Sequence, residues 1–260
     1  MSPGRESPPL LRLSAVLAGA VVLAQIAYPL SDGEPLRLLT IATVLVFAAA
    51  SLLHAAGTRG TAWALQLLLV AGGIGLQAEA VGVRTGVPFG RYAYADTLGT
   101  KLFEVPVIVP LAWVMMSYPC LLLGRQLARG MRHQATSVAL TGGLTLAAWD
   151  LFLDPQMVDA GHWTWAYPNP ALPGIPGIPL TNFVGWMVVA IVIIGALHLT
   201  LPDQPRAPQT VPAALLAWTW IGSTIGNALF FDRPGVAVWG GLAMGALTAP
   251  YLFSLRRGRP

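Results

Sequence analysis

Charged residues are scarce in this chain of 260 residues: Asp, Glu, Lys and Arg make up only 10% of it, while hydrophobic residues make up 55%. The mean hydropathy of +0.64 lies above what the core of a soluble protein of this size requires. This composition excludes a soluble domain and indicates an integral membrane protein. We attribute the pI near 9.6 to basic loops that set the topology, and we expect no nucleic-acid partner.

Cysteine is also scarce, and the common catalytic motifs are missing. The single cysteine, Cys120, lies inside an apolar run, which rules out a disulfide framework. The sequence has no Gly-rich phosphate loop, no His-x-x-x-His pair and no Gly-x-Ser-x-Gly elbow. Its four histidines are scattered, which disfavours haem or a histidine-rich diiron centre. We therefore expect neither a metal site nor a cofactor.

Apolar runs long enough to cross a hydrocarbon core of about 30 Å recur along the chain. They lie at about 13–30, 36–56, 62–80, 104–123, 136–153, 178–200, 211–230 and 235–254. These runs predict an all-α, polytopic transmembrane bundle of eight helices in the cell membrane, formed as one domain over residues 1–260. In a seven-helix alternative the first run is removed as a signal peptide or lies flat.

The basic residues distribute unevenly between the two sides of the predicted bundle. One side collects ten: Arg5, Arg12, Arg59, Arg125, Arg129, Arg132, Arg206, Arg256, Arg257 and Arg259. The other side collects five: Arg37, Arg84, Arg91, Lys101 and Arg233. Because Lys and Arg concentrate in cytoplasmic loops, the sequence predicts that both termini are cytoplasmic.

Two long loops, at 81–103 and 154–177, are rich in Gly, Pro and aromatic residues. Such segments are typical of ordered caps or re-entrant pieces, which a membrane protein tolerates where they pack on protein or line a cavity. The predicted topology places both loops on the non-cytoplasmic side. We expect them to cover a polar pocket near that membrane face.

Two aspartates lie in the stretch "AAWDLFLDP" (147–155), at the predicted end of the fifth helix. Residues four apart on a helix point the same way, so the carboxyls of Asp150 and Asp154 should be neighbours. Their repulsion disfavours double ionisation, and one should hold a proton near neutral pH. This pairing suits an acid beside a base. Asp154 also precedes Pro155, which fits a residue at a helix end or in a turn.

Glu79 is the third candidate, at the end of the third run. An ionisable residue inside the membrane points to function by default. The alternative is a structural ion pair with Arg84 or Arg91. Asn182, at the start of the sixth run, is expected in the same pocket.

Aromatic residues gather in and beside the two long loops. They are Phe89, Tyr92, Tyr94, Trp149, Trp163, Trp165, Tyr167 and Trp186. Any one of them alone fits an interfacial aromatic belt. Together, next to a proton donor, their ring faces suit stabilisation of a developing carbocation.

The segment of about 80–186 resembles the integral-membrane carotenoid biosynthesis proteins of the carotenoid 1',2'-hydratase (CruF) type. The stretches that carry the resemblance are "GVRTGVPFGRYAY" (82–94), "VPLAWVMMSYP" (109–119), "AAWDLFLDPQMV" (147–158), "GHWTW" (161–165) and "GIPLTNFVGW" (177–186). The resemblance implies cofactor-independent addition of water to the terminal double bond of an acyclic carotenoid end, as in γ-carotene, lycopene or a bacterioruberin precursor.

Hydration of such an alkene needs a proton donor, a short-lived tertiary cation and a directed water. Our hypothesis is that Asp150 protonates the alkene and that Asp154 or Glu79 positions and deprotonates the water. The cation would be surrounded by the aromatic rings of Trp149, Tyr92, Tyr94 and Trp163. The substrate site would be completed by Phe89, Trp165, Asn182 and Trp186.

Two other functions are also compatible with these residues. The spacing of Asp150 and Asp154 also fits an intramembrane prenyltransferase that holds Mg²⁺ on a diphosphate, with Glu79 as the second acidic element. A non-catalytic carotenoid or lipid carrier is the other alternative. The expected partners are a carotenoid and membrane lipid, with association with other carotenoid enzymes as a further expectation.

Overall fold

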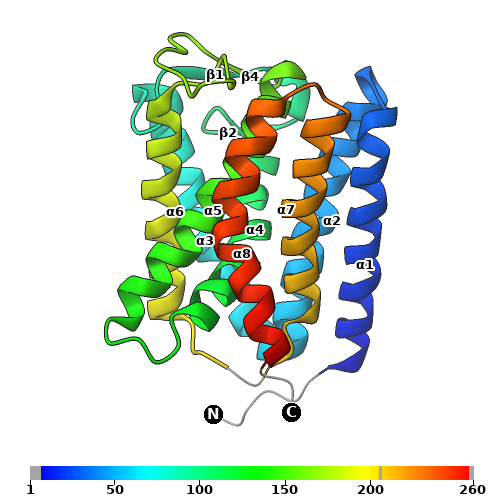
Figure 1. Cartoon of the computed structure of the whole chain (residues 1–260), viewed down its shortest axis with the longest axis vertical. Coiled ribbons are helices and arrows are strands. Elements are labelled where there is room, and N and C mark those ends of the chain that lie inside the picture. The colour runs from blue at the N-terminus through cyan, green and yellow to red at the C-terminus, as the bar shows by residue number, and fades with distance from the viewer. Residues whose placement is uncertain (1–6, 205–206, 258–260) are drawn as a thin grey trace.

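The computed structural model describes residues 7–204 and 207–257, and its long elements are all helices. They are α1 (Pro8–Ala27), α2 (Gly33–Arg59), α3 (Thr61–Thr85), α4 (Ile108–Leu127), α5 (Gln134–Asp159), α6 (Leu180–Thr200), α7 (Thr210–Leu229) and α8 (Pro234–Arg257). They run side by side as one bundle (Figure 1). The prediction of an all-α helical bundle is therefore confirmed.

Seven of these helices are long and apolar enough to cross a membrane. The exception in this part of the chain is α7, in which Thr219, Ser223 and Asn227 interrupt the apolar sequence. In Figure 1, α7 nevertheless runs beside α8 along the bundle. The chain is a multi-pass membrane protein.

Some helix boundaries differ from those predicted, and the difference at α5 bears on the site. The prediction that Asp150 and Asp154 end this helix is wrong, because α5 continues to Asp159 with Pro155 inside it. Proline removes one backbone donor, but here the helix continues through it. Both aspartates therefore lie within a helix, and the second long loop begins after it.

The first long loop is shifted along the chain relative to the predicted 81–103: it begins later and also ends later. The helix α3 extends to Thr85, and α4 begins only at Ile108. Glu104, expected to open the fourth helix, instead lies in the turn between β2 (Lys101–Leu102) and β3 (Val105–Pro106), with φ of 70°. It makes an exposed ion pair of 3.8 Å with Arg84.

The two long loops meet through a short antiparallel pair of strands. Strand β1 (Tyr92–Tyr94) pairs with β4 (Trp163–Trp165), so that Tyr92 lies opposite Trp165 and Tyr94 opposite Trp163. Because side chains alternate along a strand, these four rings share one face. We name the segments 86–107 and 160–179, with the short helix η2 (Asp96–Leu98), the aromatic roof.

Glycines let the roof and the helices approach closely. A Cβ at Gly82 of α3 or at Gly185 of α6 would lie 2.8 Å from the ring of Phe89, which inserts between these helices. Where α5 crosses α6, a Cβ at Gly143 would lie 2.6 Å from the Cα of Ile191. Small residues at helix interfaces are what allow such close packing in membrane proteins. This packing brings the α5 aspartates against the start of α6.

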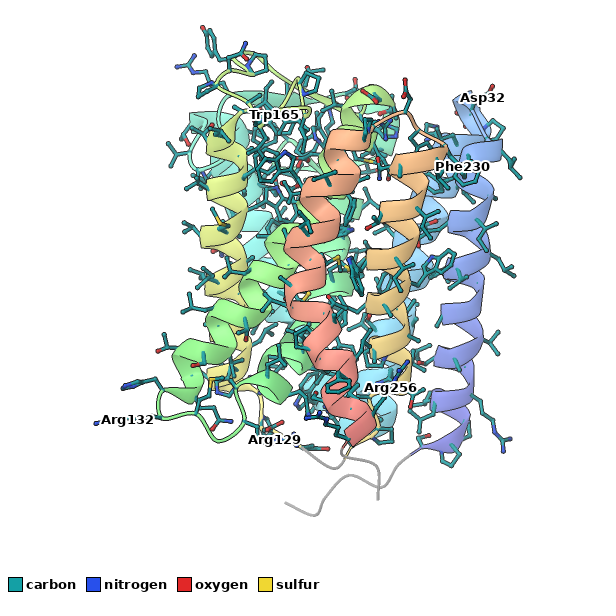
Figure 2. The ribbon with its side chains drawn as sticks, viewed as in Figure 1. Asp32, Arg129, Arg132, Trp165, Phe230 and Arg256 are labelled. Carbon is teal, nitrogen blue, oxygen red and sulfur yellow. The ribbon has the colours of Figure 1, made fainter. Side chains whose placement is uncertain are left out.

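The two ends of the bundle differ in composition. Arg129, Arg132 and Arg256 lie at one end, and Asp32, Trp165 and Phe230 lie at the other (Figure 2). Both described termini lie at the arginine-rich end (Figure 1). Arg5, Arg206 and Arg259, which contribute to the charge count, lie outside the described residues. The assignment of the arginine-rich end to the cytoplasm stays a prediction.

Candidate active site

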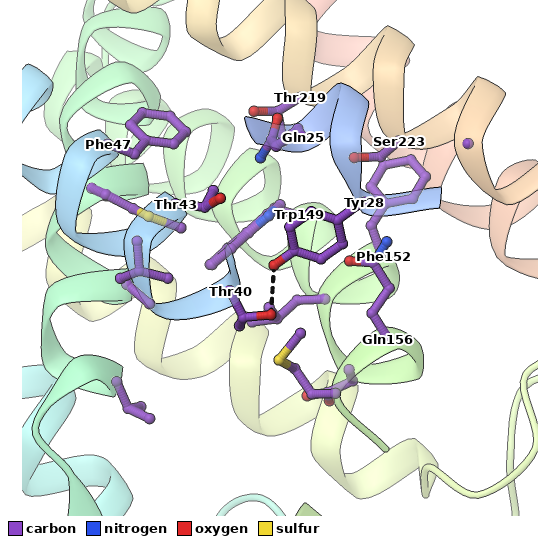
Figure 3. Close-up of a pocket in the computed structure, with 18 of the residues that line it drawn as sticks. Gln25, Tyr28, Thr40, Thr43, Phe47, Trp149, Phe152, Gln156, Thr219 and Ser223 are labelled. Atoms are coloured by element: carbon purple, nitrogen blue, oxygen red, sulfur yellow. Dashed lines mark hydrogen bonds between the residues drawn. The ribbon is translucent and has the colours of Figure 1, made fainter. Parts of the chain in front are cut away.

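A cavity of about 450 Å³ lies beneath the aromatic roof. Its inner end is lined by the three sequence-distant polar residues Glu79, Asp154 and Asn182. Its outer end lies between α1 and α7 and contains polar residues from α1, η1 (Tyr28–Leu30), α2 and α7 (Figure 3). The walls between the two ends are mostly apolar and include Phe47, Met115, Phe152 and Met157. This is the arrangement expected of a small-molecule site.

The amide of Asn182 connects the two aspartates. Its Nδ2 donates to Oδ2 of Asp154 at 2.5 Å and to Oδ2 of Asp150 at 3.0 Å. The other oxygen of Asp154 accepts a hydrogen bond of 3.2 Å from the indole of Trp163 in the roof. Both aspartates are buried, with exposed fractions of 0% for Asp150 and 2% for Asp154.

The two aspartates differ in their access to the cavity. Asp154 lines it, whereas Asp150 is not among its lining residues. Asp150 lies one turn deeper on α5, and its Oδ1 is buried without a hydrogen-bond partner among the described residues. Asp154 can therefore touch a ligand, and Asp150 can act on a ligand only through its neighbours.

Glu79 is fixed by three donors, and none of them is the arginine that the alternative interpretation required. Its Oε2 accepts hydrogen bonds from the phenols of Tyr92 at 2.5 Å and Tyr94 at 2.8 Å. Its Oε1 accepts one of 3.1 Å from the indole of Trp113. A carboxylate offers about four acceptor positions. One position on Oε1 therefore remains for a ligand or a water.

The environment keeps the two tyrosines neutral. Burial, and then the neighbouring Glu79 carboxyl, raises the pKa of Tyr92 and of Tyr94 above its usual value. A neutral phenol can donate to Glu79, whereas a phenolate cannot. Both side chains thus remain donors well above neutral pH.

The aromatic residues predicted from the sequence come together, with one exception. Those that line the cavity are Phe89, Tyr92, Tyr94, Trp149, Trp163, Trp165 and Trp186. The exception is Tyr167, which is 69% exposed. Trp186 stacks on Trp113 with a centroid separation of 3.9 Å and meets Trp149 edge-on at 6.0 Å. The inner end of the cavity is thus walled by aromatic rings.

Sequence reasoning missed several residues of the cavity. Trp113 lies in an apolar run with no polar neighbour to mark it, although its indole holds Glu79. At the outer end, Gln25 of α1 and Tyr28 of η1 belong to the first apolar run, in which no residue had been singled out. His162 and Asn227 are also buried polar residues, but they do not line the cavity.

No three His, Cys, Asp or Glu side chains among residues 7–204 and 207–257 are grouped as a metal ion would require.

Comparison with known proteins adds to this geometry. A family described as "Carotenoid biosynthesis protein" matches residues 37–248. A bisanhydrobacterioruberin hydratase from Haloarcula japonica is 35% identical over 154 residues, which cover 54% of this chain and 50% of that protein. The alignment thus spans half the length of that relative. No solved structure matches this chain.

The family match spans helices α3 to α7 and both segments of the roof. It therefore contains Glu79, Asp150, Asp154 and Asn182, the polar residues around which the cavity is built. By this match over most of its length, the chain belongs to the carotenoid biosynthesis protein family.

Proposed function

We propose that this protein is a carotenoid hydratase of the cell membrane, which adds water to the terminal 1',2' double bond of an acyclic carotenoid end. The observation that carries the proposal is a pair of carboxyl groups, Asp154 and Glu79, on the wall of one aromatic-lined cavity. The similarity to a bisanhydrobacterioruberin hydratase supports a substrate of that type, alongside γ-carotene and lycopene.

The dimensions of the cavity suit the end of a carotenoid. A volume of about 450 Å³ holds an end group rather than a complete polyene. At the outer end, the lining residues Leu30, Ile225 and Phe230 are apolar and are 86%, 47% and 64% exposed. In a membrane protein such side chains contact lipid. The polyene would therefore leave the cavity between α1 and α7 and continue in the bilayer.

The geometry favours Asp154 as the proton donor. Asp150 was the residue that the sequence favoured, but only Asp154 lines the cavity. In our proposal the two carboxyls share one proton, and Asp150 positions Asp154 through the amide of Asn182. Asp154 then protonates the less substituted carbon of the alkene, which leaves a tertiary cation at the other carbon.

The ring faces of Trp149, Trp163 and Trp186 would stabilise this cation. A water held at Oε1 of Glu79 attacks it, and Glu79 accepts the proton that the water loses. One C–H bond and one C–O bond form, the alkene π bond breaks, and no electrons are transferred to or from the substrate. A return of one proton from Glu79 to Asp154 completes the cycle.

The first test is expression of the chain in a bacterium that already makes lycopene or γ-carotene, with pigment masses as the measurement. We expect a gain of one water, absent with Asp154→Asn and retained with Glu104→Gln, which alters an exposed carboxyl remote from the cavity. A prenyl-sized gain that depends on Mg²⁺ would contradict the proposal in favour of a transferase. Unchanged pigment bound to the purified protein would contradict it in favour of a carrier.

A further inference from the structure

The outer end of the cavity holds a second group of polar side chains that the hydration chemistry above does not use. It is formed by Gln25, Tyr28, Thr40, Thr43, Thr219 and Ser223. They lie on α1, η1, α2 and α7 and face the same space (Figure 3). We infer that this group is a hydroxyl-binding subsite, which holds either a water or an alcohol group of the substrate. The inference rests on the proposed function.

Thr43 provides the main observation. It is only 5% exposed and lines the cavity. Its Oγ1 has no hydrogen-bond partner among the described residues. Most helical Thr hydroxyls in this protein bond to a backbone carbonyl one turn earlier, as Thr40 does to Leu36 at 2.9 Å. Thr43 does not, so its hydroxyl is available to a ligand. Because buried polar atoms are normally hydrogen-bonded, this hydroxyl needs a partner.

Tyr28 and Thr40 extend the same wall. The phenol of Tyr28 donates to Oγ1 of Thr40 at 2.7 Å, the bond drawn in Figure 3. Since Thr40 donates in turn to the backbone, the hydroxyl hydrogens of Tyr28 and Thr40 are both already used in hydrogen bonds. The oxygen of Tyr28 keeps a lone pair as an acceptor. This wall therefore offers a donor at Thr43 and an acceptor at Tyr28, which are neighbours that a single hydroxyl group can bridge.

Helices α1 and α7 supply the facing wall. The side-chain oxygen of Gln25 accepts a hydrogen bond of 2.7 Å from the indole of Trp218. This bond fixes the amide and leaves its NH₂ group as a donor. Thr219 donates to the carbonyl of Leu215 and keeps its acceptor positions. Ser223 adds a hydroxyl from the next turn.

This set of groups selects the kind of ligand. It contains donors and acceptors in a buried, mostly apolar cavity, and none of the six side chains is charged. An ion would have no counter-charge there, and a hydrocarbon would leave Thr43 without a partner. A hydroxyl group both donates and accepts, so it satisfies both walls at once. Water and a substrate alcohol share this chemistry.

The test uses Thr43→Val and Tyr28→Phe, which remove a hydroxyl with little change in shape. The matched control is Thr145→Val, at a buried threonine on α5 that bonds within its own helix and does not line the cavity. We would measure kcat and KM with lycopene and with an acyclic carotenoid that carries one hydroxyl. Unfolding temperatures of all variants check that each is folded.

If the subsite holds a substrate alcohol, KM rises about three- to tenfold for the hydroxylated carotenoid alone, the effect of one neutral hydrogen bond. If it holds water for the reaction, kcat falls by a similar factor with both substrates. Unchanged constants with both substrates, in folded variants, would overturn the inference.

A wild-type protein that hydrates neither pigment would refute the proposed function, and the subsite would then be tested by equilibrium binding. The inference would be supported if the wild type binds the hydroxylated pigment more tightly and Thr43→Val abolishes this preference. Equal affinities for the two pigments would overturn it.

Discussion

Among single residues, Asn182 links the two aspartates of the site, since one amide nitrogen donates to both of them. The identity of the two carboxyls was visible in the sequence because their spacing of four is a helical neighbour relationship. Their unequal access to the cavity was not, because it depends on the rotation of α5 against α6. The different roles that we propose for Asp150 and Asp154 therefore rest on the structure and not on the sequence.

Exchanging each aspartate for asparagine tests that hypothesis. We expect Asp154→Asn to lower the initial rate of hydration by 10²-fold or more, the range for loss of a general acid. Asp150→Asn should have a smaller effect, about tenfold, because this residue acts through Asn182. Rates are measured on purified protein by pigment chromatography. A complete loss with Asp150→Asn and a near-normal rate with Asp154→Asn would reverse the assignment.

The tyrosines of β1 give a prediction about pH. Because burial, and then Glu79, raises the pKa of Tyr92 and Tyr94, the unfolded chain ionises these phenols at lower pH than the folded protein does. Above about pH 10, where an unfolded tyrosine loses its proton, the free energy of unfolding should fall as pH rises. Unfolding temperatures between pH 8 and pH 11 measure this.

The control is the double variant Tyr92→Phe, Tyr94→Phe, in which the alkaline decrease should be smaller. An equal decrease in the wild type and the variant would show that these phenols do not cause it.

Among the helices, the packing of α5 on α6 sets the geometry of the site. The prediction of this pair of helices from their apolar runs was correct, but the end of α5 was not, because Pro155 was treated as a stop signal. The register of β1 on β4 was also beyond prediction, since three-residue strands carry almost no periodic signal. Tertiary contacts with the bundle, rather than local propensity, hold both features.

A methyl group at the α5–α6 crossing tests this dependence. Gly143→Ala would place its Cβ 2.6 Å from a backbone atom of Ile191, so the helices must separate. We expect a loss of about 1–3 kcal/mol in the free energy of unfolding, together with reduced hydration. The matched control is Gly195→Ala on α6, whose Cβ would make an ordinary contact of 3.5 Å with Ala139. Equal unfolding free energies for the two variants would contradict the close-packing argument.

For the molecule as a whole, the distribution of charge predicts the orientation in the membrane. The arginine-rich end contains both described termini, and the roof lies at the opposite end (Figures 1 and 2). We expect a reporter protein that functions only in the cytoplasm to be active when it is fused to either terminus. A cysteine introduced at Thr100, an exposed residue of the roof, should react with an impermeant reagent in intact cells. Labelling only after lysis would reverse the orientation.

The broad design of the molecule was predictable, and the complete cavity was not. Composition and apolar runs indicate a membrane bundle, and the roof loops stand out by their Gly, Pro and aromatic content. Trp113 and Thr43 lie in apolar helices, where nothing in the sequence separates a cavity-lining side chain from one that packs in the core. Their roles depend on which helices become neighbours.

The most direct measurement is the incubation of purified protein with an acyclic carotenoid in D₂O, followed by mass spectrometry of the pigment after exchange back into H₂O. Protonation of carbon by Asp154 predicts a product that has gained one water and keeps one deuterium on carbon, formed at a rate lower by about 10²-fold or more in the Asp154→Asn variant. Unchanged pigment with the wild-type protein, or a product of the same mass from Asp154→Asn at the same rate, would contradict acid-catalysed hydration at this site.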